Sequence, residues 1–208
     1  MNSDITSLIL IGTASYLFGS VPWAFIIGRI NGIDIRKHGS GNPGATNVMR
    51  VLGRKWGILC FVLDFLKGLL PVLAVKILTA SPDDLVITAG LAAVAGHIWS
   101  VFLKFKGGKG MATGGGVLVG IAPYSFICTG LIWIIVFYST RYVSAASVIA
   151  AAALPLSSFI FSKTGLSPLS ARFQIFLLVL AIVTIAKHHG NIRRLINGTE
   201  HKFEKKKV

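Results

Sequence analysis

Residues 110–140, GMATGGGVLVGIAPYSFICTGLIWIIVFYST, contain no Asp, Glu, Lys or Arg. A single helix of this length would extend about 46 Å at 1.5 Å per residue, whereas the hydrocarbon core of a bilayer is about 30 Å thick. Three glycines at 114–116, together with Gly120 and Pro123, favour a break inside the stretch. We therefore predict two short membrane passes that turn near Pro123.

The rest of the chain carries the same apolar signal. Of its 208 residues, 53% are hydrophobic and only 13% are charged, and the mean hydropathy is +0.73, whereas a soluble domain carries about a quarter charged residues. Because lipid offers no partner for free backbone N–H and C=O groups, membrane-spanning segments of this kind must be helical. We predict an all-α polytopic membrane helix bundle that forms one domain over residues 1–208. Its predicted spans are 5–28, 56–79, 85–103, 111–122, 124–140, 142–162 and 167–187.

The distribution of basic residues predicts the orientation of these spans. Of the 21 Lys and Arg residues, 17 lie in segment 29–55, in segment 104–109, at Arg141 and in the tail from residue 187. The positive-inside rule places all of these in the cytoplasm. A single crossing by 110–140 would put Arg141 and the tail outside, whereas two crossings return them. We predict seven passes, with the N-terminus outside and the C-terminus cytoplasmic; five passes, with 110–140 as a hairpin, would preserve the same sidedness.

Composition also excludes several classes of function. The net charge of +14 does not indicate nucleic-acid binding, because the basic residues lie between apolar spans; in a polytopic protein it indicates orientation and contact with membrane lipids. The first span precedes its basic residues, unlike a signal peptide, so we expect it to be retained. Cys60 and Cys128 lie within apolar spans, where packing explains them. None of the seven acidic residues lies in the motifs described below, so we predict no metal and no cofactor.

The first polar motif is HGSGNPGATN at residues 38–47, followed by Arg50. Three glycines and a proline rule out a regular helix, and glycines in such turns let backbone N–H groups form an anion-binding nest. Thr46 or Asn47 is a candidate cap for a following helix, and the Arg50 guanidinium suits phosphate oxygens. The alternative is a plain polar turn between two spans.

The second motif is FKGGKG at residues 105–110. It lacks the spacing of a nucleotide-binding P-loop, so we predict no ATP or GTP site. Lys109 is framed by glycines, whose small size allows a phosphate to approach closely while the backbone donates N–H groups. The alternative, an anchor that follows the positive-inside rule, explains Lys104 and Lys106.

The third motif is KHHGNIRRL at residues 187–195. On a helix His188 and Asn191 share one face, whereas His189 points away. We therefore choose His188 as the candidate, against the alternative of a polar helix end.

Two weaker signals accompany these motifs. Residues 141–147, RYVSAAS, read either as an interfacial anchor with packing hydroxyls or as part of a site. Asp64 and Lys67 lie three positions apart within the second span and form either a functional site or a structural ion pair.

Together these segments resemble the bacterial acyl-phosphate:glycerol-3-phosphate acyltransferase family, the PlsY family, over essentially the whole chain. The shared motifs are G-S-G-N-P-G-A-T-N-V-x-R at 39–50, G-H at 96–97 leading into F-K-G-G-K-G at 105–110, R-Y-V-S-x-A-S at 141–147 and H-x-x-N-I-x-R-L at 188–195. One departure is Ser100, where the family pattern leads us to expect proline, and it affects the loop between the two parts of the second motif.

The resemblance implies an enzyme that transfers a fatty acyl group from an acyl phosphate to the 1-hydroxyl of glycerol 3-phosphate, giving lysophosphatidate and phosphate for phospholipid synthesis. It implies a bacterial cytoplasmic (inner) membrane location and a single site facing the cytoplasm. An acyl phosphate is already activated, so no covalent nucleophile is required. The implied catalytic residues are Ser40, Arg50, Lys109, His188 and Asn191. The implied substrate-binding residues are Gly39, Gly41, Asn42, Gly44, Thr46, Asn47, Lys104, Gly107, Gly108, Ser144 and Arg194.

Two other readings compete with this one. A transporter of a phosphorylated metabolite would explain the anion site and the spans, although a transport site lies near the membrane midplane. A protein that only anchors partners through its basic tail, Lys205–Lys207, would leave the glycine-rich motifs without a role.

Overall fold

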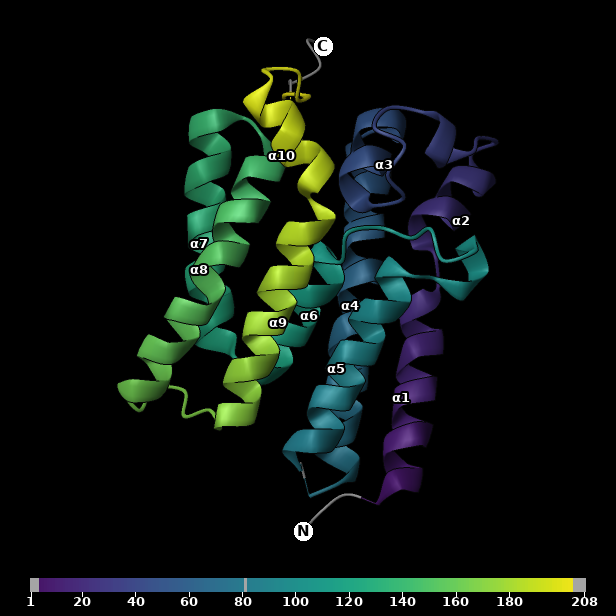
Figure 1. The fold of residues 1–208 in the computed structure, drawn as a ribbon. Coiled ribbons are helices and arrows are strands. Elements are labelled where there is room, and N and C mark those ends of the chain that lie inside the picture. The colour runs from purple at the N-terminus through teal and green to yellow at the C-terminus, as the bar shows by residue number, and fades with distance from the viewer. Residues whose placement is uncertain (1–3, 81, 204–208) are drawn as a thin grey trace. The chain divides into compact units, whose positions relative to one another are not determined.

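The computed structural model describes residues 4–80 and 82–203. These residues form helices joined by loops, and none of them lies in a strand (Figure 1). By contacts the chain divides into two compact units, residues 1–121 and 122–208, which are described separately below. Unit 1 contains α1 (Ile5–Ser20), α2 (Trp23–Ile30), η1 (Ile35–Lys37), α3 (Ala45–Leu52), α4 (Arg54–Leu78), α5 (Asp83–Ile98), η2 (Val101–Leu103) and α6 (Met111–Ile121). Unit 2 contains α7 (Pro123–Thr140), α8 (Val143–Lys163), α9 (Ala171–Lys187) and α10 (His189–Ile196).

A helix lies at each predicted span, which confirms the all-α membrane fold. Within the described residues, five segments are long and apolar enough to cross a membrane, or six if the bent pair α9 and α10 forms one span. The apolar helix α6 is shorter, with 11 residues. It ends at Ile121 and α7 begins at Pro123, so the predicted break is confirmed. Seven passes and their orientation stay a prediction.

The first predicted span contains a break that the sequence analysis did not include. Helix α1 ends at Ser20 and α2 begins at Trp23. Pro22 lies in the gap, and proline both lacks an N–H and clashes with the preceding turn of a helix. This break leaves the carbonyl of Val21 available to accept a hydrogen bond from Lys67 Nζ, 2.7 Å away.

Close helix contacts hold unit 1 together. Helix α1 packs mainly against α5, and α4 packs against α3 and α6. A Cβ added at Gly96 of α5 would overlap the Tyr16 carbonyl of α1, and one at Gly116 of α6 would overlap the Phe65 carbonyl of α4. Small residues at such contacts let membrane helices approach closely.

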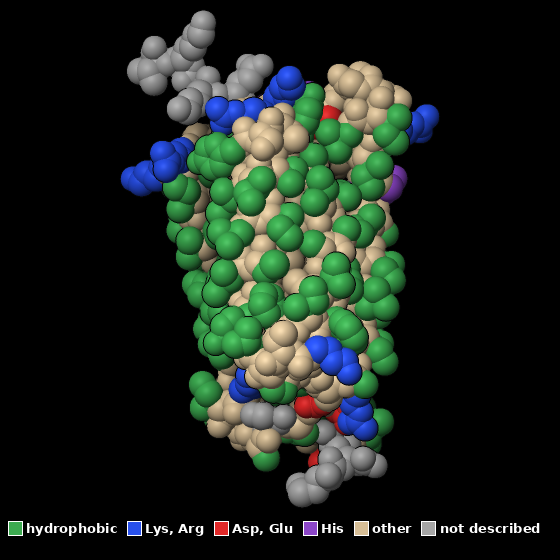
Figure 2. All heavy atoms as spheres, turned by 90° about the vertical axis from the view of Figure 1, so that its left-hand side faces the viewer, with side chains coloured by type: hydrophobic (Ala, Val, Ile, Leu, Met, Phe, Trp, Pro, Cys, Tyr) green, Lys and Arg blue, Asp and Glu red, His purple; other side chains and the backbone are tan. Residues whose placement is uncertain are grey.

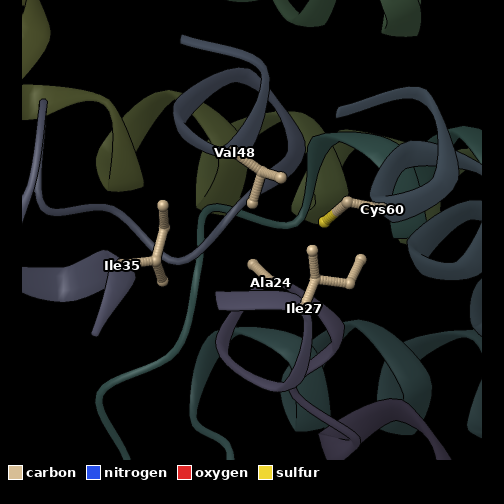
Figure 3. Close-up of a cluster of buried hydrophobic side chains, with 5 residues drawn as sticks. All are labelled: Ala24, Ile27, Ile35, Val48 and Cys60. Atoms are coloured by element: carbon tan, nitrogen blue, oxygen red, sulfur yellow. The ribbon is translucent and has the colours of Figure 1, made fainter. Parts of the chain in front are cut away.

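A small apolar core supports the first motif. It consists of Ala24 and Ile27 from α2, Ile35 from η1, Val48 from α3 and Cys60 from α4 (Figure 3). Ile35 precedes the loop at 38–44 and Val48 follows it, so both ends of this loop are fixed by the same core. The buried position of Cys60 agrees with its expected packing role.

Unit 2 is built from helices that pack in chain order. Helix α7 packs against α8 and α8 against α9, while α10 contacts both α8 and α9. On the face shown in Figure 2, hydrophobic side chains cover the middle of the helices, whereas Lys and Arg lie toward their ends. This pattern suits helices that contact lipid along their length. The tail segment 205–207, on which the anchor alternative depends, lies outside the described residues.

Candidate active site

The first motif forms a loop that is folded around the side chain of Asn47. This side chain is 1% exposed. Its Oδ1 accepts the N–H of Ser40 at 2.9 Å, and its Nδ2 donates to the carbonyls of Ile35 and His38 at 3.1 and 3.0 Å. Gly39 and Gly41 have φ values of +59° and +69°, a conformation that side chains disfavour. The amide of Asn47 is therefore used to shape the loop.

Two expectations for this loop are wrong in detail. The N–H groups of Ser40, Gly41 and Gly44 donate to Asn47 Oδ1 and to the carbonyls of His38 and Asn42, so they do not form an open anion nest. Helix α3 begins at Ala45 after Gly44, with no side-chain cap, so Thr46 and Asn47 are not caps but lie in its first turn. These three N–H groups are therefore already used within the loop, and phosphate binding at this motif stays a prediction.

Arg50 lies on α3, one turn after Asn47, and is half-buried. Two other arginines near the loop are engaged elsewhere. Arg36 donates two hydrogen bonds to Asp34, at 2.9 and 2.7 Å, and Arg29 lies 3.6 Å from the same carboxylate. The hydrogen bond from Arg36 holds the pKa of Asp34 well below its usual range and, reciprocally, raises the pKa of Arg36. Both guanidinium groups thus face the single carboxylate of Asp34.

The second motif folds back onto the end of α5. The N–H of Gly107 donates to the Ile98 carbonyl at 3.0 Å, and the N–H of Gly108 donates to the His97 carbonyl at 3.1 Å. The expectation that these glycine N–H groups bind phosphate is therefore wrong, because the protein already uses them. Lys109 is half-buried and stands just before α6.

The start of this loop is strained. Lys104 and Phe105 both have left-handed backbones, with φ values of 52° and 62°, although neither is a glycine. Such outliers persist only where the surrounding structure fixes them, and they are found at functional sites. Lys104 is exposed at this bend, and its role in substrate binding stays a prediction.

Ser100 is fully integrated into the fold. Its hydroxyl donates to the Ser20 carbonyl at 2.6 Å, and the side chain is 1% exposed. Its φ of −61° is one that proline would also adopt. The backbone expected with proline is therefore kept, and the serine adds a link between η2 and the end of α1.

In unit 2, His188 lies at the bend between α9 and α10, which meet at 55°. Its Nδ1 lies 2.8 Å from the Thr184 carbonyl, and because a carbonyl only accepts, this nitrogen carries the proton. His188 is 3% exposed, whereas His189 is exposed. In the neutral ring its Nε2 then carries the lone pair, and the role of His188 in the site stays a prediction.

Glu200 was not identified from the sequence, although it organises the polar residues of unit 2. Its Oε1 accepts from Asn191 Nδ2 at 2.8 Å and from Ser144 Oγ at 3.1 Å, while its Oε2 accepts from Arg194 Nε at 2.8 Å. Burial raises the pKa of Glu200, but the hydrogen bonds from Asn191, Arg194 and Ser144 outweigh it and hold the pKa below its usual value.

This carboxylate therefore joins Asn191, an implied catalytic residue, to Ser144 and Arg194, two implied substrate-binding residues. The available signal was one acid that follows the basic third motif by five residues. Glu200 falls outside the motif, so the motif alone does not indicate it. Among the described residues, no group of three His, Cys, Asp or Glu side chains is placed to hold a metal ion.

Comparison with protein families gives a match that spans most of the chain. The profile of a family described as glycerol-3-phosphate acyltransferase matches residues 9–198. A glycerol-3-phosphate acyltransferase of Geotalea daltonii is 44% identical over 201 residues, covering 97% of this chain and 100% of the relative. One from Trichlorobacter lovleyi is 47% identical over 191 residues, covering 91% and 94%.

Two solved structures are similar in fold. Both are crystal structures of PlsY, an integral membrane glycerol 3-phosphate acyltransferase. Its glycerol 3-phosphate form matches with a TM-score of 0.84 and 40% identity, over 95% of this chain and 96% of that one. Its lysophosphatidic acid form matches with a TM-score of 0.82 and 39% identity, over the same shares.

Proposed function

The chain belongs to the glycerol-3-phosphate acyltransferase family, and we propose that it transfers a fatty acyl group from an acyl phosphate to the 1-hydroxyl of glycerol 3-phosphate. The products are lysophosphatidate and inorganic phosphate. The observation that supports this most strongly is the 40% identity, over 95% of this chain, to an acyltransferase solved in its glycerol 3-phosphate form. The location that fits is a bacterial cytoplasmic membrane, with the basic motif segments on the cytoplasmic side.

The reaction needs no covalent enzyme intermediate. The 1-hydroxyl oxygen attacks the acyl carbon, the bond from that carbon to the phosphate oxygen breaks, and phosphate leaves. The hydroxyl proton passes to a phosphate oxygen of the acyl phosphate, which is itself a base at hand. Holding two anions in line accounts for a large part of the rate, because a bimolecular step becomes effectively unimolecular.

In unit 1, Arg50 and Lys109 neutralise phosphate charge and stabilise the oxyanion that develops on the acyl carbonyl. Ser40, Asn42 and Thr46 supply polar side chains around the phosphate. The remaining residues implied at this end act through the backbone, by shaping the loops and letting phosphate approach: Gly39, Gly41, Gly44, Asn47, Gly107 and Gly108. Lys104 adds positive charge at the exposed bend of the second loop.

In unit 2, His188 and Asn191 orient glycerol phosphate. Ser144 and Arg194 donate to the same Glu200 carboxylate as Asn191 does. They hold this carboxylate in place, and the carboxylate in turn fixes the direction of the Asn191 side chain.

The test is an assay of purified protein in detergent with palmitoyl phosphate and glycerol 3-phosphate. Phosphate release that requires both substrates supports the enzyme, and it should fall at least about a hundredfold in Lys109→Ala but little in Lys106→Ala, a control whose lysine is exposed in the same loop. A folded sample that releases no phosphate, yet moves glycerol 3-phosphate into liposomes, would favour the transporter instead.

A further inference from the structure

A cluster of buried charges lies beneath the second loop. Asp64 and Lys67 are in the middle of α4 and are each 2% exposed, with Lys67 Nζ 2.9 Å from Asp64 Oδ1. Charged groups at this depth of a membrane span are costly, and apolar side chains would pack the helices without that cost. The sequence left open whether this pair is structural or functional, and its surroundings decide the question.

The third member of the cluster is His97, near the end of α5. It is 6% exposed, and its Nδ1 lies 3.6 Å from Asp64 Oδ1. The opposite nitrogen, Nε2, faces the second loop: a Cβ added at Gly108 would overlap it. The His97 carbonyl also accepts the N–H of Gly108 at 3.1 Å. The ring and the backbone carbonyl of His97 therefore both contact the segment that leads into Lys109.

The cluster is tied to its neighbours on several sides. Lys67 Nζ gives its hydrogen bond to the Val21 carbonyl at the break between α1 and α2, at 2.7 Å. Thr113 of α6 donates to the Asp64 carbonyl at 2.9 Å. A space of about 10 Å³ remains, which is room for about one water molecule. Its lining includes Pro43 of the first loop and Gly107 and Gly108 of the second.

We propose that Asp64, Lys67 and His97 are positioning residues that present Lys109 to the substrate phosphate. Asp64 orients the His97 ring, Lys67 balances the carboxylate charge, and the ring fixes the backbone at Gly108. A carboxylate behind a histidine sets the orientation of the ring at metal sites and in catalytic triads. The proposal rests on the proposed function, because substitutions in the cluster are expected to change how Lys109 binds the substrate phosphate.

The test compares His97→Ala, His97→Asn, Lys109→Ala and the double variant His97→Ala/Lys109→Ala. Lys109→Ala identifies the substrate whose KM depends on the lysine. We expect His97→Ala to raise the KM of that same substrate about tenfold or more, and His97→Asn to raise it less, because its amide can take the place of Nδ1–H. The double variant should be no more than about threefold worse than Lys109→Ala, because residues that act through one contact are not additive.

Removing one buried charge can unfold a protein, so a second variant replaces the pair together. In Asp64→Leu/Lys67→Met both charges are gone, and such replacement leaves folding close to neutral. We expect a folded protein with the same rise in KM as His97→Ala. Thr129→Val is the matched control, since it removes a buried hydrogen bond to the Ser125 carbonyl within α7 and touches no member of the cluster. Its constants should stay within about twofold of the wild type.

Wild-type KM values in the Leu/Met variant, or additive effects of His97→Ala and Lys109→Ala, would overturn the inference. Either result would leave the proposed function intact, because each is measured against an active wild-type enzyme. A wild type with no transferase activity would instead overturn the proposed function itself.

Discussion

Asn47 and Glu200 show how single residues divide the work in this protein. Asn47 fixes the first loop through three hydrogen bonds, and Glu200 gathers Ser144, Asn191 and Arg194 in unit 2. Neither role was visible in the sequence. The motifs predicted polar residues that bind phosphate, and no acidic residue lies within them. A motif shows which side chains are present, whereas partners distant in sequence decide which of those side chains are already used.

Glu200→Gln should reduce the transition temperature of the protein in detergent. The substitution leaves Arg194 without its carboxylate, and loss of a charge-assisted hydrogen bond costs about 1.5–3 kcal/mol. Because the pKa of Glu200 is lowered in the folded state, its stabilisation is present above the ordinary glutamate pKa of 4.5 and is lost as pH falls through the folded value. The difference in melting temperature between wild type and variant should therefore narrow below about pH 4.5. A difference that is constant from pH 7 down to the acid limit would contradict this.

His188→Ala should leave measurable transferase activity, with a higher KM for glycerol 3-phosphate or a lower kcat. In the proposed mechanism a phosphate oxygen of the substrate accepts the hydroxyl proton, while His188 only orients the glycerol phosphate. Steady-state kinetics in both substrates measures this. Complete loss of turnover at unchanged substrate affinity would make His188 the general base.

At the scale of elements, the two glycine-rich loops are the parts where sequence predicted least. Glycine and proline content correctly placed a break near Pro123, whereas of the non-helical stretch predicted over 38–47 only residues 38–44 form a loop, because α3 already begins at Ala45. The hydrogen bonds of the second loop to Ile98 and His97 depend on where α5 ends, and no local pattern specifies that. The break at Pro22 was missed because the surrounding apolar run continues through it.

Gly108→Ala should impair activity about tenfold or more without unfolding the protein, because the new Cβ would overlap His97 Nε2 and displace the loop. Kinetics and the melting temperature together check this. Gly130→Ala in α7 is the matched control, since no atom of the described residues lies within 4 Å of its new Cβ apart from the chain neighbours and the backbone of its own helix. Equal activity of the two variants would show that the loop tolerates displacement.

At the scale of the molecule, composition and charge were enough to predict a helical membrane protein, because apolar length and basic segments are properties of the whole sequence. The helices lie at the predicted spans, whereas the number of crossings depends on how the short α6 is accommodated. Membrane sidedness is thus the global feature that the helices alone do not define.

Single-cysteine labelling tests the predicted sidedness. With Cys60 and Cys128 replaced, Lys37→Cys should react with a membrane-impermeant maleimide only after cells are permeabilised, and Asp84→Cys should react in intact spheroplasts. These positions lie in segments that the positive-inside rule places on opposite sides. Reaction of both from the same side would refute the orientation.

The central claim is direct acyl transfer to glycerol 3-phosphate, and product stoichiometry tests it most directly. Purified protein given palmitoyl phosphate and glycerol 3-phosphate should form lysophosphatidate and inorganic phosphate in a 1:1 ratio, followed by mass spectrometry and phosphate assay, and neither should form when glycerol 3-phosphate is omitted. Phosphate released together with free fatty acid in the absence of glycerol 3-phosphate, or no lysophosphatidate from a folded sample, would contradict the account.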